Sequence, residues 1–296
     1  MKLGSNSLVI ALVIVVALGA VVFGILMSNK QPAPQTYDEL TTLPSKKVEQ
    51  IDIALMNLLC AENLPGSENL DIEQCLSMLD QWADLVSRNE AKYSAQFFQN
   101  QSRYDNSYAK FQAVNLGLTL KDDLKCEYNQ ELIRSGAMED LQSTRFFQNS
   151  RDLFLHGFVE TRVGSCSSLP VLMVAIGRRC GYPLHLVTCK GHLFCRWDDG
   201  HERFNIETAC PGVDVQPDSY YMKWPYPTTE AEAKSEKYLK NLDSMEELAL
   251  FVWQRAMCLD EHDRFTEASE AYFIALQSFP DSKYLKAYLS NVNWRK

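Results

Sequence analysis

Cys166 is the residue whose type and setting point most directly to chemistry. It lies in the segment Gly164-Ser165-Cys166-Ser167-Ser168, at the start of a helix predicted over 167–179. The first backbone N–H groups of a helix have no intrahelical partners, and they favour the thiolate, the nucleophilic form of cysteine. The same N–H groups can stabilise an oxyanion. Taken alone, a cysteine at a helix start is weak evidence for catalysis.

A predicted β-hairpin supplies partners for this thiol. If Asp199-Gly200 form a two-residue turn, the pairs across the hairpin are Asp198 with His201, Arg196 with Arg203, Phe194 with Asn205, and His192 with Glu207. His192 and Glu207 then share one face with Cβ atoms about 5 Å apart, and Asn205 is their diagonal neighbour. A carboxylate beside an imidazole fixes its tautomer and supports the imidazolium, as in a Cys-His-acid triad. The alternative is an ordinary half-buried strand pair.

Zinc binding is the competing chemistry. Cys189, His192 and Cys195 are spaced three apart, and Cys210 follows. Successive residues of a strand point to opposite faces, so His192 and Cys195 diverge, and the chain has no C-x-x-C pair. We therefore predict no metal site. Phosphate-binding glycine loops are also missing from the sequence, so no cofactor is predicted. The remaining histidines are expected to be structural or on the surface: His156, His185, His201 and His262.

The elements that must position these residues can be read around them. The helix over 167–179 ends with Arg178 and Arg179, Gly181 follows at the place of a left-handed C-cap, and Pro183 prevents continuation. Strand-like runs follow over 184–190, 192–197 and 203–208.

Helical patterns dominate on both sides of this central region. Residues 37–150 are predicted to be mainly helical, with a helix capped by Asp71 and an aromatic series assigned to the core, whose members are Tyr93, Phe97, Phe98, Tyr104, Tyr108 and Phe111. Residues 245–296 form a helical tail. Six of its positions match one tetratricopeptide repeat, with a generic helical hairpin as the alternative: Ala256, Leu259, Ala268, Tyr272, Ala275 and Pro280.

The N-terminus has the composition of a membrane anchor. Residues 8–27 carry no charge and are long enough, as a helix, to cross a bilayer; residues 1–7 form a short tail before them, and 28–36 a linker after them. The alternative is a cleaved signal peptide, but the run exceeds the usual apolar core of about 7–15 residues. We expect a single-pass protein whose soluble part lies outside the cytoplasm, in the periplasm.

Charge and cysteine content limit the partners. The chain has 29 Lys and Arg against 38 Asp and Glu, and two of the lysines precede residue 36, so the remainder carries a net charge of −11. Such acidity argues against binding to nucleic acid. The nine cysteines are odd in number. Outside the cytoplasm eight of them could pair, and the one left free should be Cys166.

The motifs together resemble the transglutaminase-like superfamily. The similarity is strongest over residues 151–226, in Thr161–Leu172, Ala175–Leu184, Lys190–Asp198 and Arg203–Thr208. More narrowly, the chain is similar to a bacterial branch with a helical N-terminal region and a tetratricopeptide-like tail. The resemblance implies an α+β, papain-like core in which a helix carries the cysteine and a small antiparallel sheet carries the histidine and the acid, with extra helices around it.

The resemblance also implies a function. It makes Cys166 the nucleophile, His192 the general base and Glu207 the orienting residue, with Asn205 as the alternative third member because the family usually has Asp at that position. The predicted activity is that of a membrane-anchored cysteine peptidase, amidase or acyltransferase acting on amide bonds of peptides or proteins. The alternative is a non-catalytic protein-binding module at the membrane. Neither reading specifies the oligomeric state.

Overall fold

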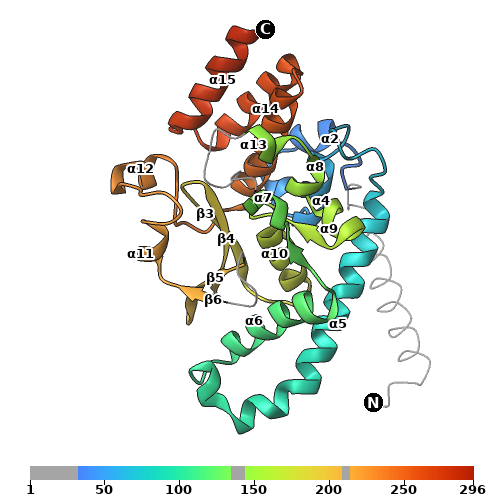
Figure 1. Ribbon diagram of the computed structural model, residues 1–296, viewed down its shortest axis with the longest axis vertical. Coiled ribbons are helices and arrows are strands. Elements are labelled where there is room, and N and C mark those ends of the chain that lie inside the picture. The colour runs from blue at the N-terminus through green and yellow to red at the C-terminus, as the bar shows by residue number, and fades with distance from the viewer. Residues whose placement is uncertain (1–32, 135–143, 209–213) are drawn as a thin grey trace, which may run out of the picture. The chain divides into compact units, whose positions relative to one another are not determined.

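The computed structural model describes residues 33–134, 144–208 and 214–296, and within it Thr36–Lys296 form one unit. The fold is of the α+β class, as predicted: helices surround one small antiparallel sheet (Figure 1). The predicted membrane span, 8–27, lies outside the described residues. In the part of the chain that is described, no helix has the length and apolar character needed to cross a bilayer.

The first half is helical, as predicted. Its elements are the α-helices α2 (Tyr37–Thr41), α3 (Ser45–Val48), α4 (Ile53–Cys60), α5 (Ile72–Gln99), α6 (Tyr108–Leu118), α7 (Gln130–Arg134), α8 (Ser150–Leu153) and α9 (Leu155–Thr161), the 3-10 helices η1 (Gln101–Tyr104) and η3 (Thr144–Phe147), the π-helical turn η2 (Thr119–Asp123), and the strands β1 (Glu127–Tyr128) and β2 (Val163–Gly164). The two strands pair in parallel, with Tyr128 opposite Gly164.

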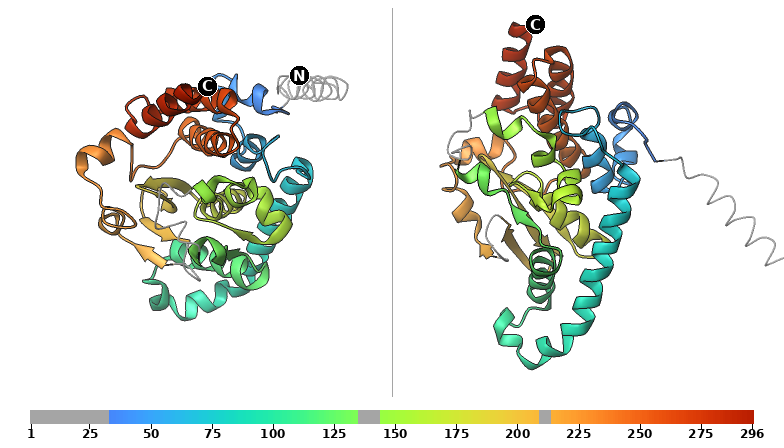
Figure 2. Two further views of the ribbon diagram at one scale, coloured as in Figure 1. Left: turned by 45° about the horizontal axis from the view of Figure 1, so that its top comes forward. Right: turned by 45° about the vertical axis from the view of Figure 1, so that its right-hand side comes forward.

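Helix α5 forms where its sequence predicts. The side chain of Asp71 accepts a hydrogen bond from the backbone N–H of Gln74, which caps the helix. The predicted aromatic core is only partly correct, because Phe97 is buried but Phe98 is 65% exposed. Ring contacts join Phe97 of α5 to its neighbour Phe98 and to Phe111 of α6. Figure 2 shows the long helix α5 leading into the turn before α6. At this exposed turn there is too little surrounding protein to cover both faces of the cluster.

The sheet is the element that positions the site. Its strands are β3 (Leu184–Cys189), β4 (His192–Asp198), β5 (Arg203–Glu207) and β6 (Asp214–Gln216), in that spatial order. Helix α10 (Leu169–Arg179) packs against β3 and β4 on one face, and α11 (Asp218–Tyr221) lies on the other, followed by α12 (Glu230–Ser235) (Figure 1). Both faces are therefore covered, which explains the almost continuous burial of β4.

Helix α10 ends as its sequence predicts. Gly181 has a φ of +79°, and its N–H donates to the Arg178 carbonyl, while the N–H of Tyr182 donates to the Gly177 carbonyl. This pair of bonds is a Schellman motif, which requires a left-handed residue that glycine adopts without strain. The chain then reverses directly into β3, so the end of α10 sets where the sheet begins.

The C-terminal tail consists of α13 (Ser244–Glu261), α14 (Phe265–Ser278) and α15 (Lys283–Arg295). The five predicted repeat positions other than Pro280 are all buried: Ala256, Leu259, Ala268, Tyr272 and Ala275. Helix α13 also lies against α4, so the hairpin is built into the body of the fold. This arrangement satisfies both the repeat pattern and a generic hairpin.

An ion pair joins this tail to the helix that follows Cys166. The guanidinium of Arg178 donates two hydrogen bonds to the carboxylate of Glu247, at 2.6 and 3.0 Å, and a third to the Leu184 carbonyl. Glu247 is 1% exposed, and burial raises the pKa of its carboxyl group despite the nearby guanidinium. Loss of the arginine would leave this carboxylate buried without its counterion.

We predict that Arg178→Met lowers the free energy of unfolding by about 3 kcal/mol, because a buried carboxylate loses its partner. The double variant Arg178→Met/Glu247→Leu should recover most of this loss, since no charge is then left uncompensated. Urea denaturation of Arg178→Met, Glu247→Leu and the double variant measures the coupling free energy between the two side chains. Equal destabilisation in Arg178→Met and the double variant would contradict this account.

Candidate active site

Cys166 lies in a turn that is held rigidly to the body of the protein. The helix begins at Leu169, two residues later than predicted, and Cys166 occupies the turn before it. The hydroxyl groups of Ser165 and Ser168 both donate to the Asp152 carbonyl, at 2.5 and 3.0 Å. Ser165 Oγ also accepts from the Ser167 N–H, at 3.0 Å. The serines on either side of the cysteine thus fix its backbone and leave the thiol as the functional group of the turn.

A glycine allows this turn to form. A Cβ atom added to Gly164 would come within 2.2 Å of the Phe158 ring and 2.7 Å of Ser168 Oγ. Any side chain there would displace the turn that carries Cys166. The glycine is therefore required by close packing, since Gly164 itself has no positive φ.

His192 and Glu207 are in direct contact, as the sequence predicted. The Nε2 atom of His192 lies 2.9 Å from Glu207 Oε2, and the side chains are 0% and 3% exposed. The Nδ1 atom of His192 is buried and makes no hydrogen bond among the described residues. Cys166 lies close enough to the same ring to raise its pKa. With Nε2 bonded to Glu207, Nδ1 is the ring nitrogen that remains for the thiol.

The register behind that prediction is wrong. Asp198 pairs with Arg203 and Arg196 pairs with Asn205, so four residues, 199–202, form the turn. The Asp199 carboxylate explains the longer turn, because it accepts hydrogen bonds from the N–H groups of His201 and Glu202. The shift moves each partner by two positions, and side chains two apart share a face. His192 and Glu207 are therefore diagonal rather than opposite, but they still meet.

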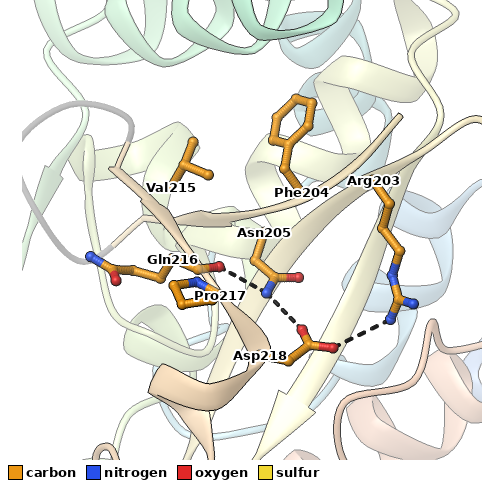
Figure 3. A pocket seen from close by; sticks show the side chains of 7 residues that line it. All are labelled: Arg203, Phe204, Asn205, Val215, Gln216, Pro217 and Asp218. Atoms are coloured by element: carbon orange, nitrogen blue, oxygen red, sulfur yellow. Dashed lines mark hydrogen bonds and ion pairs between the residues drawn. The ribbon is translucent and has the colours of Figure 1, made fainter. Parts of the chain in front are cut away.

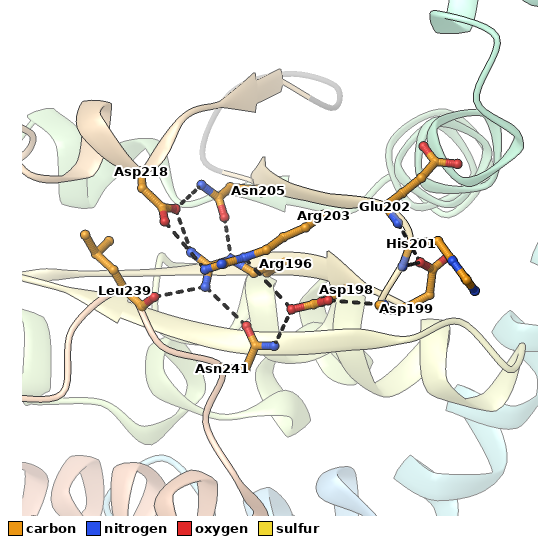
Figure 4. Close-up of polar contacts among 11 residues, drawn as sticks. Arg196, Asp198, Asp199, His201, Glu202, Arg203, Asn205, Asp218, Leu239 and Asn241 are labelled. Atoms are coloured by element: carbon orange, nitrogen blue, oxygen red, sulfur yellow. Dashed lines mark hydrogen bonds and ion pairs between the residues drawn. The ribbon is translucent and has the colours of Figure 1, made fainter.

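Asn205 does not serve as the partner of His192. Its Oδ1 atom accepts a hydrogen bond from Arg196 Nε at 2.7 Å, and its Nδ2 donates to Asp218 Oδ1 at 2.8 Å (Figure 4). Arg196 is fully buried, and it also donates to Asp218 and to the Leu239 carbonyl. Asn205 belongs to this arginine network, which ties β4 and β5 to α11.

An open pocket lies beside the arginine network. It is lined by Arg203, Phe204, Asn205, Val215, Gln216, Pro217 and Asp218 (Figure 3). Its lining includes neither Cys166 nor His192. The polar groups of Asn205 and Asp218 that border it are already bound to each other and to Arg196. The pocket is thus separate from the cysteine and histidine.

Aromatic residues around α11 complete the surroundings of the histidine, and sequence reasoning missed them. The Tyr221 hydroxyl donates to Glu207 Oε2 at 3.1 Å, and its ring stacks on Phe194 with centroids 3.7 Å apart. The Trp224 ring meets His192 edge-on at 4.7 Å. The backbone N–H of Thr208 donates to the other carboxylate oxygen, Glu207 Oε1, at 2.9 Å. The aromatic run Tyr220-Tyr221 followed by Trp224 was the signal available in the sequence.

The electrostatics favour a charged histidine. Burial disfavours the imidazolium, but the neighbouring Cys166 and Glu207 outweigh this effect and raise the pKa of His192 to about 9. Burial raises the pKa of the thiol at seven other described cysteines: Cys60, Cys75, Cys126, Cys180, Cys189, Cys195 and Cys258. These seven remain protonated near neutral pH.

The remaining cysteine and histidine predictions have mixed outcomes. All eight described cysteines are free thiols, so the disulfide pairs that an extracytoplasmic location would allow do not form among them, and Cys210 lies outside the described part. Within the described ranges, no three His, Cys, Asp or Glu side chains come together as metal ligands. His156 is structural, as predicted: it is fully buried against Ser150 and the Gly66 carbonyl.

Comparisons of the chain with family models, with curated proteins and with solved structures found no match.

The site predicts that Glu207 and Asn205 respond differently to substitution. Glu207→Gln removes the charge that supports the His192 imidazolium, so alkylation of Cys166 by iodoacetamide at pH 7 should slow by about 10-fold or more. Asn205→Ala should instead lower the free energy of unfolding by about 1–3 kcal/mol, because Arg196 loses a buried acceptor, and leave the alkylation rate within about threefold. Peptide mapping and urea denaturation measure both. A larger loss of reactivity in Asn205→Ala would show that the acid is misassigned.

Proposed function

We propose that the chain is a papain-like thiol enzyme, similar to the transglutaminase-like superfamily, that cleaves or transfers amide bonds of peptides or proteins. Cys166 is the nucleophile, His192 the proton shuttle and Glu207 the orienting acid. The observation that carries the proposal is the buried His192–Glu207 hydrogen bond of 2.9 Å, with Cys166 close enough to the same imidazole to raise its pKa. The turn before α10 carries the cysteine, and the neighbouring strands β4 and β5 carry the other two residues, which supports the arrangement that the resemblance implies.

The first step of the reaction needs a thiolate and an imidazolium. A raised His192 pKa of about 9 keeps the imidazole protonated at neutral pH, beside the sulfur. The thiolate attacks the carbonyl carbon, and the carbonyl π electrons move to oxygen. Collapse of this adduct breaks the C–N bond and leaves a thioester on Cys166, while His192 gives its proton to the departing amine.

The second step returns the enzyme to its starting form. Neutral His192 accepts a proton from water or from an amine, which attacks the thioester and releases Cys166. Water gives hydrolysis and an amine gives acyl transfer. Through both steps Glu207 holds Nε2, and its own two oxygens are fixed by hydrogen bonds from Tyr221 and the Thr208 N–H. The imidazole therefore keeps the orientation that presents Nδ1 to the sulfur.

A second function follows from the burial of the site. Cys166 is 8% exposed, and the His192 side chain is wholly buried. Such a closed site suits a protein-binding module in which the triad residues serve packing and turnover does not occur. The two functions differ in the reactivity of Cys166, since packing alone provides no reason for a thiolate at acid pH.

We predict that iodoacetamide at pH 6 labels Cys166 at least about 100-fold faster than any of the seven other described cysteines, because their raised pKa values leave almost no thiolate. His192→Ala should remove this advantage, since the sulfur then lacks its cation. Mass spectrometry of peptides from the folded protein measures each rate.

His185→Ala is the matched control. His185 lies on β3, and burial lowers the pKa of its imidazole, so its loss should leave the labelling of Cys166 unchanged. Equal and slow labelling of all cysteines in the wild type would reject the enzyme and favour the binding module. Labelling with a thiol-directed acyl probe then separates a merely reactive cysteine from one that accepts acyl groups.

A further inference from the structure

One segment of the chain covers the histidine of the site. Residues 219–235, called here the covering segment, run from α11 through α12 beside the sheet (Figure 1). Its Trp224 ring meets the His192 ring edge-on at 4.7 Å, and its Tyr221 hydroxyl donates to Glu207. The His192 side chain is 0% exposed. A substrate that is to meet this imidazole therefore requires the covering rings to move.

The chain is held firmly just outside both ends of the covering segment. Buried Arg196 donates to Asp218 Oδ1 at 2.7 Å, before the segment, and to the Leu239 carbonyl at 3.0 Å, after it. Glu236 is also buried, and it accepts a hydrogen bond from the Lys283 N–H of α15 at 2.8 Å. Leu239 has a φ of +61°, a conformation that is unfavourable for a residue with a side chain. These fixed ends are the points about which the segment between them can move.

The covering segment itself has few buried contacts. Its helix α12 has no buried residue. Beneath the segment lies a small apolar cluster, separate from the main core, whose buried members are Val187, Cys189, Phe194 and Tyr221. Cys189 is 4% exposed, and its Sγ lies 3.8 Å from the Trp224 carbonyl oxygen. A segment with so few buried apolar contacts opens at a lower free energy than the main core does.

One acidic side chain joins the covering segment to two neighbouring elements. Glu232 Oε1 of α12 lies 2.9 Å from Lys190 Nζ, in the turn between β3 and β4, and accepts a hydrogen bond from the Tyr284 hydroxyl of α15 at 2.6 Å. Lys190 is two residues before His192 in the chain. The Lys190 and Glu232 side chains are 25% and 22% exposed, so water can reach and separate them.

We propose that the covering segment is a lid that opens to admit substrate to Cys166, and that Glu232 holds it closed. The proposal rests on the proposed acyl chemistry of Cys166. Opening breaks the contacts of Glu232 with Lys190 and Tyr284 and withdraws the aromatic rings from the histidine, while both ends stay in place. Because Tyr284 belongs to α15, the C-terminal tail takes part in controlling access to the site.

Cys189 reports the opening of the lid independently of the thiol chemistry, because it lies beneath the segment. In Glu232→Ala, fluorescein maleimide should label Cys189 at pH 8.5 and Cys166 at pH 7 each about 10-fold faster than in the wild type, since the variant loses one ion pair and one hydrogen bond. Cys60 and Cys258 lie in the main core and should keep their rates. Peptide mapping of the folded protein measures each rate.

An exchange of charges tests the contact itself. Lys190→Glu should also accelerate the labelling of Cys189 and Cys166, because two carboxylates then face each other, and the double variant Lys190→Glu/Glu232→Lys should return both rates toward those of the wild type. Glu267→Ala is the matched control, since it removes a surface ion pair with Arg264 on the tail and should change neither rate.

Unchanged labelling of Cys189 and Cys166 in Glu232→Ala would overturn the lid. Acceleration of Cys189 alone would also overturn it, because the segment would then open without controlling access to Cys166. Equal acceleration of all described cysteines would indicate global unfolding and contradict a local opening. Absence of selective labelling of Cys166 in the wild type would instead reject the proposed function, while Cys189 would still measure whether the segment opens.

Discussion

The hydrogen bond between His192 and Glu207 is the interaction on which the rest of the site depends. Both side chains are out of contact with water, where an isolated charge is costly. Each therefore requires the other, and Glu207 requires further donors, which Tyr221 and the Thr208 N–H supply. Burial alone would keep this imidazole neutral, but Cys166 and Glu207 together raise its pKa to about 9. A cation beside Cys166 is the consequence.

The two faces of the sheet have different surroundings. On the face toward α10, Leu193, Cys195 and Trp197 of β4 enter the main apolar core. On the other face, His192 and Arg196 lie among aromatic and polar partners. Arg196 holds Asp218 at the start of α11, and α11 ends at Tyr221, which donates to Glu207. A buried arginine thereby supports, through α11, the acid that orients the histidine.

The periodicity of the sequence was sufficient to predict the helices and strands, but not to predict the exact register in which the strands pair. Helix α10 and the strands appear near their predicted positions because glycine, proline and β-branched residues mark them locally. The hairpin register failed because a side chain, Asp199, satisfied two backbone N–H groups and lengthened the turn. The contact between His192 and Glu207 survived because the error was an even number of residues.

The sequence could not predict contacts between residues that lie far apart along the chain. Tyr128 lies opposite Gly164, two residues before Cys166, through a two-residue parallel pairing, and no local pattern encodes such a pairing. The spacing made Asn205 a reasonable third member of the triad. Its side chain instead accepts a hydrogen bond from Arg196, whose burial the sequence did not predict. The exposure of Phe98 had a similar origin, since helical spacing identifies a stripe but not whether anything covers it.

Titration of the His192 ring by NMR with ¹⁵N-labelled histidine tests the central claim most directly. The raised pKa of about 9 predicts that both ring nitrogens of His192 carry protons at pH 7.5 and that the ring loses one near pH 9. Comparison with His192→Gln assigns the signal. A ring that is neutral at pH 7.5, titrating at or below the usual pKa of about 6.5, would contradict the account.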